Sequence, residues 1–274
     1  MSQVPRFAVF GHPVAHSRSP RLHALFAAQT GIVLEYTAMD ATSARFADGV
    51  RAFFAHGGRG ANVTLPYKAA AFALADVRTP AAQGLGVANV LTALPDGRIE
   101  ADSNDGAGML ADLRGRRGMD PCGRRTLLLG AGGAARAAAF ALLGAGVASL
   151  VIANRTPGRA QALAGALAAT ARVRAVAWAV LAGESAFDLI INATSAGVQH
   201  AALRLPAALA GRRTSAYDLS YGPAARGFIA WAEQAGCAAA SDGLGMLVET
   251  AAASFARWHG VWPDTDAALR TLQE

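Results

Sequence analysis

The stretch Thr126-Leu-Leu-Leu-Gly-Ala-Gly-Gly-Ala-Ala-Arg136 decides the fold of this chain. Its first four residues form a short apolar run typical of a buried strand, and an alanine-rich segment of helical character follows the glycines. Gly130 suits a tight turn, Gly132 allows a close approach to the backbone, and Ala135 lets the helix lie close to the sheet. A strand, a glycine turn and a helix in this order indicate a dinucleotide-binding unit, although a purely structural turn is the alternative.

The end of the next expected strand, Leu150–Ala153, indicates which dinucleotide is bound. It runs into Asn154-Arg155-Thr156, followed by Arg159, and offers no carboxylate for a ribose 2′-hydroxyl. Arginine and hydroxyl groups suit a 2′-phosphate instead, so we expect NADP rather than NAD; ordinary surface arginines on a solvated turn are the alternative. The residues expected to contact the cofactor here are Gly130, Ala131, Gly132, Gly133, Ala134, Asn154, Arg155, Thr156 and Arg159.

Strand and helix patterns divide the chain into two domains. The second half alternates short apolar runs with alanine-rich helices, which is the βαβ rhythm of a doubly wound parallel sheet. Its expected strands are Thr126–Leu129, Leu150–Ala153, Val173–Ala177, Leu189–Ala193 and Ser215–Asp218. The first half has strands expected at Phe7–Phe10, Leu34–Ala38, Gly60–Thr64, Val87–Ala93 and Arg98–Ala101, and helices expected at Leu22–Gln29 and Ala44–Ala55. A helix near Gly106–Leu113 is expected to lead into the second half. Ser19 is expected to cap the first of these helices, with Pro20 at its first position.

We therefore expect an α/β protein with an N-terminal α/β substrate domain, a doubly wound Rossmann domain that binds NADP, and a cleft between them. After Gly243, a helix of about 16 residues and another near Asp266–Leu272 are expected to return to the first domain. The expected division is 1–105 plus 243–274 for the substrate domain and 106–242 for the NADP-binding domain.

Composition narrows the class of protein. The 274 residues are 53% hydrophobic and 16% charged, which indicates a globular chain. No apolar stretch of about 18 residues predicts a membrane span, and the N-terminus lacks the zones of a signal peptide, so we expect a cytoplasmic protein without a membrane partner. The two cysteines have no partner at metal-ligand spacing, so no metal is expected. The formal charge of +6 fits an acidic ligand, and the arginines are too scattered to favour nucleic acid.

The basic residues show an unusual imbalance: 24 of the 25 are arginine, and the only lysine is Lys68. Arginine fills most surface roles of a cation but cannot release its proton at working pH, whereas lysine can. A single lysine in such a background suggests proton transfer, with chance retention as the alternative.

Polar residues of the first half collect at expected strand ends and at one helix start. Ser17 and Ser19 precede a helix, where hydroxyls either cap it or bind a carboxylate. Asn62–Lys68 places polar side chains at a strand end, and Asn89 and Asp105 lie near later strand ends. Ligands of open α/β sheets bind at such ends.

Eight segments together resemble the motifs of shikimate dehydrogenases, in order and over nearly the whole chain. They are Gly11–Pro20, Ala61–Lys68, Asp102–Gly106, Gly130–Arg136 with Asn154–Thr156, Ile191–Ser195, Tyr217–Tyr221 and Asp242–Leu247. Of these, Asn62-Val-Thr-Leu-Pro-Tyr-Lys68 and Asp242-Gly-Leu-Gly-Met-Leu247 are highly specific. The resemblance implies NADPH-dependent reduction of 3-dehydroshikimate to shikimate, a step in the biosynthesis of chorismate and the aromatic amino acids.

The resemblance also implies a division of roles. Lys68 and Asp105 match the catalytic pair, in which the ammonium protonates the alkoxide left by hydride transfer and the carboxylate orients the ammonium. The residues that match substrate contacts are Ser17, Ser19, Thr64, Asn89, Asp105, Tyr221 and, at the position of a usual glutamine, Thr250. Leu219 and Gly243 match positions at the nicotinamide end of the cofactor site.

Three departures leave the choice of substrate open. Ser103-Asn104 stands where an asparagine–threonine pair is usual, Val90 replaces a threonine, and Thr250 is shorter than the usual glutamine. A quinate- or aminoshikimate-type dehydrogenase of the same family is therefore an alternative, as is a non-catalytic NADP-binding module. A tRNA-linked Rossmann reductase would need a nucleophilic cysteine in the first half of the chain. Both cysteines follow residue 120, so this class of enzyme is excluded. Monomer and homodimer both remain open.

Overall fold

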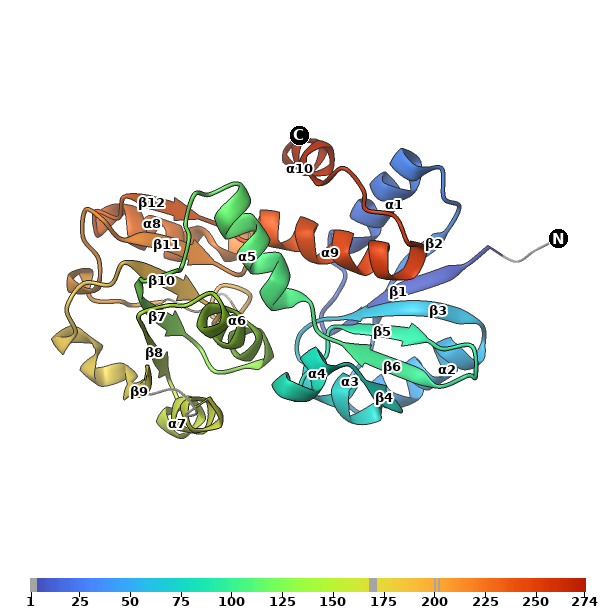
Figure 1. Cartoon of the computed structure of the whole chain (residues 1–274), viewed down its shortest axis with the longest axis horizontal. Coiled ribbons are helices and arrows are strands. Elements are labelled where there is room, and N and C mark those ends of the chain that lie inside the picture. Colours follow the sequence, from blue (N-terminus) through green and yellow to red (C-terminus); the bar gives the residue numbers. More distant parts are fainter. Residues whose placement is uncertain (1–3, 168–171, 200, 202) are drawn as a thin grey trace. The chain divides into compact units, whose positions relative to one another are not determined.

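The computed structural model describes residues 4–167, 172–199, 201 and 203–274. The chain forms two compact units: unit 1 comprises the described residues up to Gly108 together with Leu247–Glu274, and unit 2 comprises those of Met109–Met246. Each unit contains a six-stranded sheet (Figure 1). Whereas the sequence predicted divisions at 105/106 and 242/243, the units divide inside helices α5 (Asp105–Gly115) and α9 (Leu244–His259).

Unit 1 is built on a mixed sheet. Its strands are β1 (Arg6–Gly11), β2 (Glu35–Asp40), β3 (Gly58–Val63), β4 (Val77–Arg78), β5 (Val90–Ala93) and β6 (Ile99–Asp102). The order is β2-β1-β3-β5-β6-β4, with β1 parallel to β2 and β3, and with β5 antiparallel to β3 and β6. The hairpin between β5 and β6 turns at Gly97, whose φ of 85° is one that glycine adopts readily.

Helices cover both faces of the sheet of unit 1. Side chains alternate along β1, so the strand presents apolar residues to both faces, and each face packs against helices. The helices are α1 (Ser19–Thr30), α2 (Phe46–Ala55), α3 (Lys68–Leu74), α4 (Pro80–Leu85), the first turn of α5, most of α9, and α10 (Thr265–Gln273). Phe10 enters a core cluster with Phe46 and Phe53 of α2. Phe7, on the opposite face, has its ring centroid 4.9 Å from that of Trp258 in α9.

Unit 2 confirms the predicted doubly wound sheet. Its strands are β7 (Arg125–Leu129), β8 (Ser149–Asn154), β9 (Val173–Ala177), β10 (Leu189–Asn192), β11 (Ser215–Asp218) and β12 (Ala239–Ser241), and its helices are α6 (Gly133–Gly144), α7 (Pro157–Ala166) and α8 (Arg226–Gln234). All neighbours are parallel in the order β12-β11-β10-β7-β8-β9, the strand order of a Rossmann sheet. Leu127 and Leu129 enter one core cluster and Leu128 the other, so the last three residues of β7 are apolar and buried on both faces of the sheet.

Two local predictions in unit 1 were wrong, and several short elements were missed. Ser19 does not cap α1; it is the first helical residue, and its backbone N–H donates to the Ser17 hydroxyl at 3.3 Å. Lys68 does not end a strand, because β3 stops at Val63 and Lys68 begins α3, where three alanines favour a helix. Helices α3 and α4 and strands β4 and β12 were not predicted, since each is short and lacks a clear period.

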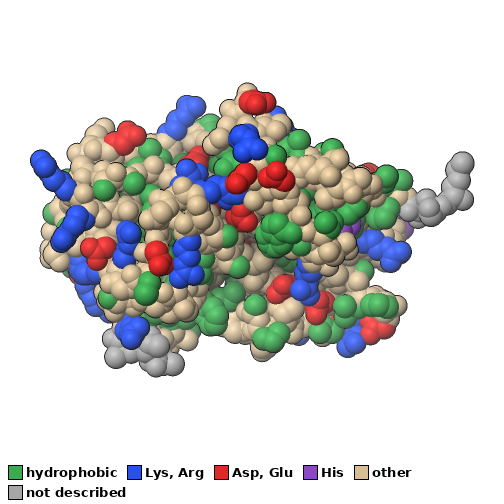
Figure 2. All heavy atoms as spheres, turned by 45° about the horizontal axis from the view of Figure 1, so that its top comes forward, with side chains coloured by type: hydrophobic (Ala, Val, Ile, Leu, Met, Phe, Trp, Pro, Cys, Tyr) green, Lys and Arg blue, Asp and Glu red, His purple; other side chains and the backbone are tan. Residues whose placement is uncertain are grey.

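Among the described residues, none of the helices combines the length and apolarity that a membrane crossing requires. In the same part of the chain, no group of three or more histidine, cysteine, aspartate or glutamate side chains is arranged to hold a metal ion. On the face shown in Figure 2, basic and acidic side chains are interspersed rather than gathered into one stripe.

Candidate active site

Lys68 and Asp105 form an ion pair in unit 1. The Lys68 ammonium donates a hydrogen bond to Asp105 Oδ2, and the two side chains are only 14% and 8% exposed. Lys68 begins α3 and Asp105 begins α5. The start of α5 favours the negative charge of Asp105, because the helix dipole is positive at its N-terminus. The structure therefore places a proton donor beside a carboxylate that can orient it.

Asn89 holds the second oxygen of the same carboxylate. Its amide Nδ2 donates to Asp105 Oδ1 at 2.9 Å and to Asn104 Oδ1 at 2.7 Å. Its Oδ1 accepts from the backbone N–H of Asn104 at 2.9 Å. Asn89 is 3% exposed, so this buried amide has partners on both of its polar atoms.

Hydrogen bonds continue from these residues to α9, β3 and β2. Asn104 Nδ2 donates to Ser254 Oγ of α9 at 3.1 Å, and Asn62 Nδ2 donates to the same oxygen at 2.8 Å. The hydroxyl of Tyr36 donates to Asn62 Oδ1 at 2.7 Å. Burial raises the pKa of Tyr36 well above its usual value, so the phenol stays protonated.

Three predicted site residues of unit 1, Lys68, Asp105 and Asn89, thus lie on one hydrogen-bond network. It continues through Asn104, Ser254 and Asn62 to Tyr36, none of which was assigned to the site from the sequence. Of these four, Asn62 and Asn104 had a sequence signal, because both lie in segments that resemble the family motifs. Ser17 and Ser19 form a further pair at the start of α1, in which the Ser17 hydroxyl donates to Ser19 Oγ at 3.2 Å.

The remaining predicted substrate contacts differ in their surroundings. Thr64 is half-buried in the turn after β3, and its N–H donates to the carbonyl of Phe10 at 2.9 Å. Thr250 lies in α9, with a buried Oγ1 that lacks a hydrogen-bond partner among the described residues and faces Gly108 of α5. Tyr221 is half-buried in unit 2, just before the short 3₁₀ helix η3 (Gly222–Ala224).

The glycine turn of unit 2 has the geometry that the sequence predicted. Gly130 has a φ of 111°, and a Cβ at this position would lie 2.7 Å from the carbonyl oxygen of Ala193. At Gly132, which precedes the first turn of α6, a Cβ would meet no protein atom within 4 Å. The first N–H groups of α6 have no intrahelical acceptors and form an anion site. The fold therefore excludes a side chain at Gly130, whereas the space beside Gly132 is open and has room for a pyrophosphate.

The turn after β8 presents exposed basic and polar groups. Asn154 Nδ2 donates to the carbonyl of Thr156 at 3.0 Å, and this contact closes the turn before α7. Arg155, Thr156 and Arg159 are exposed. Among the described residues, the two guanidinium groups have no ion pair, so they are available to a 2′-phosphate.

Gly243 packs against the end of β11, where no side chain fits. A Cβ on Gly243 would lie 2.6 Å from the carbonyl oxygen of Leu219, and its N–H donates to the carbonyl of Ser220 at 2.8 Å. Next to them, Asp218 accepts hydrogen bonds from Asn192 Nδ2 and from the Ser220 N–H, both at 2.7 Å. Burial raises the pKa of Asp218 to about 6. Asp218 was not predicted as a site residue, because it lies in an expected strand.

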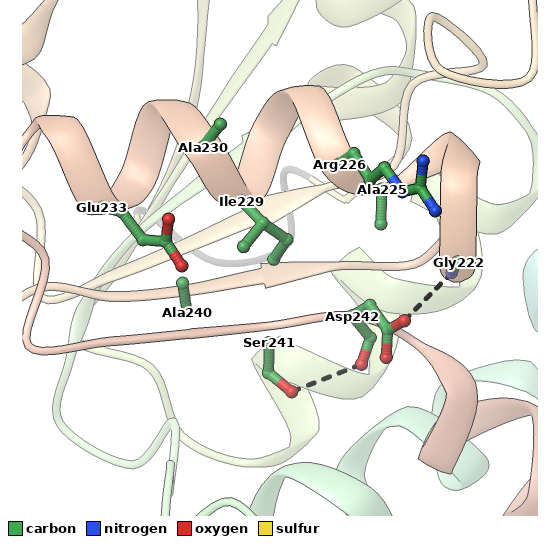
Figure 3. A pocket seen from close by; sticks show the side chains of 9 residues that line it. All are labelled: Gly222, Ala225, Arg226, Ile229, Ala230, Glu233, Ala240, Ser241 and Asp242. Atoms are coloured by element: carbon green, nitrogen blue, oxygen red, sulfur yellow. Dashed lines mark hydrogen bonds between the residues drawn. The ribbon is translucent and has the colours of Figure 1, made fainter. Parts of the chain in front are cut away.

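A surface depression of about 520 Å³ lies elsewhere in unit 2, between α8 and β12 (Figure 3). It is lined by Gly222, Ala225, Arg226, Ile229, Ala230, Glu233, Ala240, Ser241 and Asp242. Both carboxylate oxygens of Asp242 accept backbone N–H groups, from Gly222 at 3.0 Å and from Leu244 at 3.2 Å. None of the described residues that were predicted as site residues lines this depression.

Comparisons with known proteins agree with this geometry. Residues 9–91 match the family model of the shikimate dehydrogenase substrate binding domain, and residues 116–203 match that of shikimate / quinate 5-dehydrogenase. The shikimate dehydrogenase (NADP(+)) of Xanthomonas euvesicatoria pv. vesicatoria is 53% identical over 98% of this chain and 97% of its own length. That of Stenotrophomonas maltophilia is 48% identical, over 98% and 96%.

Solved structures give the same result. Shikimate 5-dehydrogenase from Thermus thermophilus, in complex with NADP(H) and shikimate, superposes with a TM-score of 0.86 at 36% identity, over 98% of this chain and 99% of that one. An Ael1 enzyme from Pseudomonas putida superposes with a TM-score of 0.88 at 42% identity, over 98% of both chains. The predicted family is thus confirmed over both units. The chain belongs to the shikimate dehydrogenase family.

Proposed function

We propose that this protein is an NADP-dependent shikimate dehydrogenase, which reversibly reduces 3-dehydroshikimate to shikimate in the biosynthesis of chorismate and the aromatic amino acids. The observation that supports this proposal most directly is the Lys68–Asp105 ion pair. The chain that contains it matches curated NADP-dependent shikimate dehydrogenases over 98% of its length. A non-catalytic NADP-binding module has no need of such a half-buried pair, so the pair favours an enzyme.

We assign the chemistry to side chains of unit 1. NADPH, when bound, supplies the hydride that reduces the ketone carbon. The Lys68 ammonium then gives a proton to the new alkoxide oxygen, and it is reloaded from water. Asp105 keeps the ammonium oriented and compensates its charge before the transfer. In the oxidation of shikimate, the same amine accepts the hydroxyl proton.

We assign binding to both units. The substrate contacts are Ser17, Ser19, Thr64, Asn89, Asp105, Tyr221 and Thr250. The cofactor contacts are Gly130, Ala131, Gly132, Gly133, Ala134, Asn154, Arg155, Thr156, Arg159, Leu219 and Gly243. Unit 1 would be the substrate domain and unit 2 the NADP-binding domain, a division supported by the substrate-domain match over residues 9–91 and by the Rossmann strand order. A cytoplasmic location remains a prediction. Monomer and homodimer both remain open.

Initial rates with shikimate or quinate, each with NADP or NAD, test the proposal. We expect the highest kcat/KM for shikimate with NADP. If shikimate with NADP gives no turnover, the proposal is wrong. A preference for quinate would support the alternative substrate, for which the unpartnered Thr250 hydroxyl is the structural reason, because this shorter side chain replaces the usual reader of the ring hydroxyls.

A further inference from the structure

We propose that Asn104 is a positioning residue: it orients Asn89 and Asp105 around Lys68 and anchors them to helix α9. This inference rests on the proposed function. Asn104 lies in the loop between β6 and α5, directly before Asp105. The departure from the usual asparagine–threonine pair places an amide here, which has one donor more than a threonine hydroxyl and a longer reach.

Asn104 and Asp105 together determine which way the Asn89 amide faces. An amide side chain can turn by 180° and exchange its oxygen and nitrogen, and only its partners decide the orientation. The backbone N–H of Asn104 donates to Asn89 Oδ1 at 2.9 Å, and Asn104 Oδ1 accepts from Asn89 Nδ2 at 2.7 Å. Turning Asn89 would place oxygen against oxygen and N–H against N–H. Its NH₂ group is therefore held toward Asp105 Oδ1, at 2.9 Å.

The other end of the Asn104 side chain reaches helix α9. Asn104 Nδ2 donates to the Thr250 carbonyl at 3.2 Å and to Ser254 Oγ at 3.1 Å. Ser254 is fully buried, and its hydroxyl donates to the same carbonyl at 3.0 Å. Asn104 therefore has a fixed rotamer, because its Oδ1 and Nδ2 are both engaged, and the loop that carries Asp105 is tied to a packed helix.

This arrangement affects the reaction through Asp105 rather than through contact with substrate. Asp105 has one oxygen on Lys68 and the other on Asn89. In Asn104→Ala, Asn89 loses the acceptor Asn104 Oδ1, while the backbone N–H of residue 104 still donates to Asn89 Oδ1. The loop that carries Asp105 also loses both of its side-chain hydrogen bonds to α9, so Asn89 and Asp105 are held less firmly. We expect the Lys68 ammonium to be less well aligned for proton transfer, which lowers kcat more than it raises KM.

A double-mutant cycle tests the inference. The proteins are the wild type, Asn104→Ala, Asn89→Ala and the double variant, each measured for kcat and KM with shikimate and NADP. Asp264→Ala is the matched control, because Asp264 caps α10 of unit 1, outside the network, and its loss lowers stability without touching the site. Thermal unfolding and NADP affinity are measured for every variant. Asn104→Thr replaces Asn104→Ala if the latter does not fold.

We expect Asn104→Ala to lower kcat by at least about tenfold, with the KM for NADP unchanged. In the Asn89→Ala background, the same change should lower kcat by a clearly smaller factor than in the wild type, since part of the effect of Asn104 passes through Asn89. Normal kcat in Asn104→Ala, or a loss of kcat that multiplies with that of Asn89→Ala, overturns the inference. An equal loss in Asp264→Ala overturns it as well, because it would reflect stability alone. Absence of shikimate turnover by the wild type would instead refute the proposed function.

Discussion

Lys68 and Asp105 meet across unit 1 from the first residues of two helices, 37 positions apart in the chain. The pair joins the chain's only lysine to a carboxylate that is 8% exposed. Removing one member of a largely buried pair leaves the other charge without its partner. Substitutions here therefore need a measurement that separates catalysis from stability.

Lys68→Arg and Lys68→Met should both lower kcat by about 100-fold or more while the KM for shikimate changes little. Arginine keeps the charge beside Asp105 but cannot deliver the proton, and methionine removes both. Steady-state rates with shikimate and NADP check this. NADP affinity should stay at the wild-type value in both variants, and near-normal kcat in either one would refute the role of Lys68.

Arg155→Ala and Arg159→Ala should raise the KM for NADP by about tenfold each and leave the KM for NAD nearly unchanged. A charge-assisted contact with the 2′-phosphate contributes roughly 1.5–3 kcal/mol, and NAD has no such group. Both side chains are exposed, so the fold should not suffer. Arg212→Ala, another exposed arginine of unit 2, serves as the control. A parallel rise in the KM for both cofactors would show that these arginines do not read the 2′-phosphate.

Gly130→Ala and Gly132→Ala should separate folding from cofactor binding. At Gly130 the φ of 111° and the carbonyl of Ala193, 2.7 Å from the new Cβ, predict a loss of about 2 kcal/mol or more in the free energy of unfolding. At Gly132 the Cβ meets no protein atom within 4 Å, so stability should be retained while NADP binding weakens. Urea unfolding and NADP titration of both variants measure this, and equal effects on both properties would contradict it.

His23 should make the protein less stable in mild acid. Its ring is fully buried, stacked on Tyr36 at 4.0 Å, with neither nitrogen hydrogen-bonded among the described residues. Burial, with a smaller contribution from the charge of His259, lowers its pKa from 6.5 to about 3. The unfolded chain therefore takes up the proton first, and stability falls as pH decreases from about 6.5 toward 3. Between pH 7 and pH 5 the loss is about 2 kcal/mol.

Urea unfolding at these two pH values, for the wild type and for His23→Phe, isolates this contribution. The variant should lose about 2 kcal/mol less than the wild type. The variant is compared with the wild type because other groups titrate in the same pH range. Burial also lowers the pKa of His259, which adds to the loss of stability in acid. The raised pKa of Asp218 has the opposite effect, because its protonation in the folded protein increases stability as the pH falls below about 6. His16→Gln, at an exposed position, should behave as the wild type does. An unchanged pH dependence in His23→Phe would refute the prediction.

Local sequence patterns determined much of this molecule. The apolar run Thr126–Leu129, its glycine turn and the recurring strand–helix rhythm sufficed for the Rossmann sheet, because such patterns act over a few neighbouring residues. The motifs also predicted the family. Helix α3 was missed because seven residues between a proline turn and a short strand carry too little periodicity to be seen.

Only the tertiary structure decided which polar groups meet. Ser103 and Asn104 are neighbours in the sequence, but their surroundings differ. Asn104 bridges Asn89 and Ser254, whereas the Ser103 hydroxyl is buried without a partner among the described residues. Tyr36, Asn62 and Ser254 come from β2, β3 and α9, and no local pattern relates positions so far apart. The sequence by itself determined the elements, the cofactor turn and the lone lysine. The packing of α9 onto the sheet of unit 1 decided the network around that lysine, because hydrogen bonds between distant residues depend on where the backbone places them.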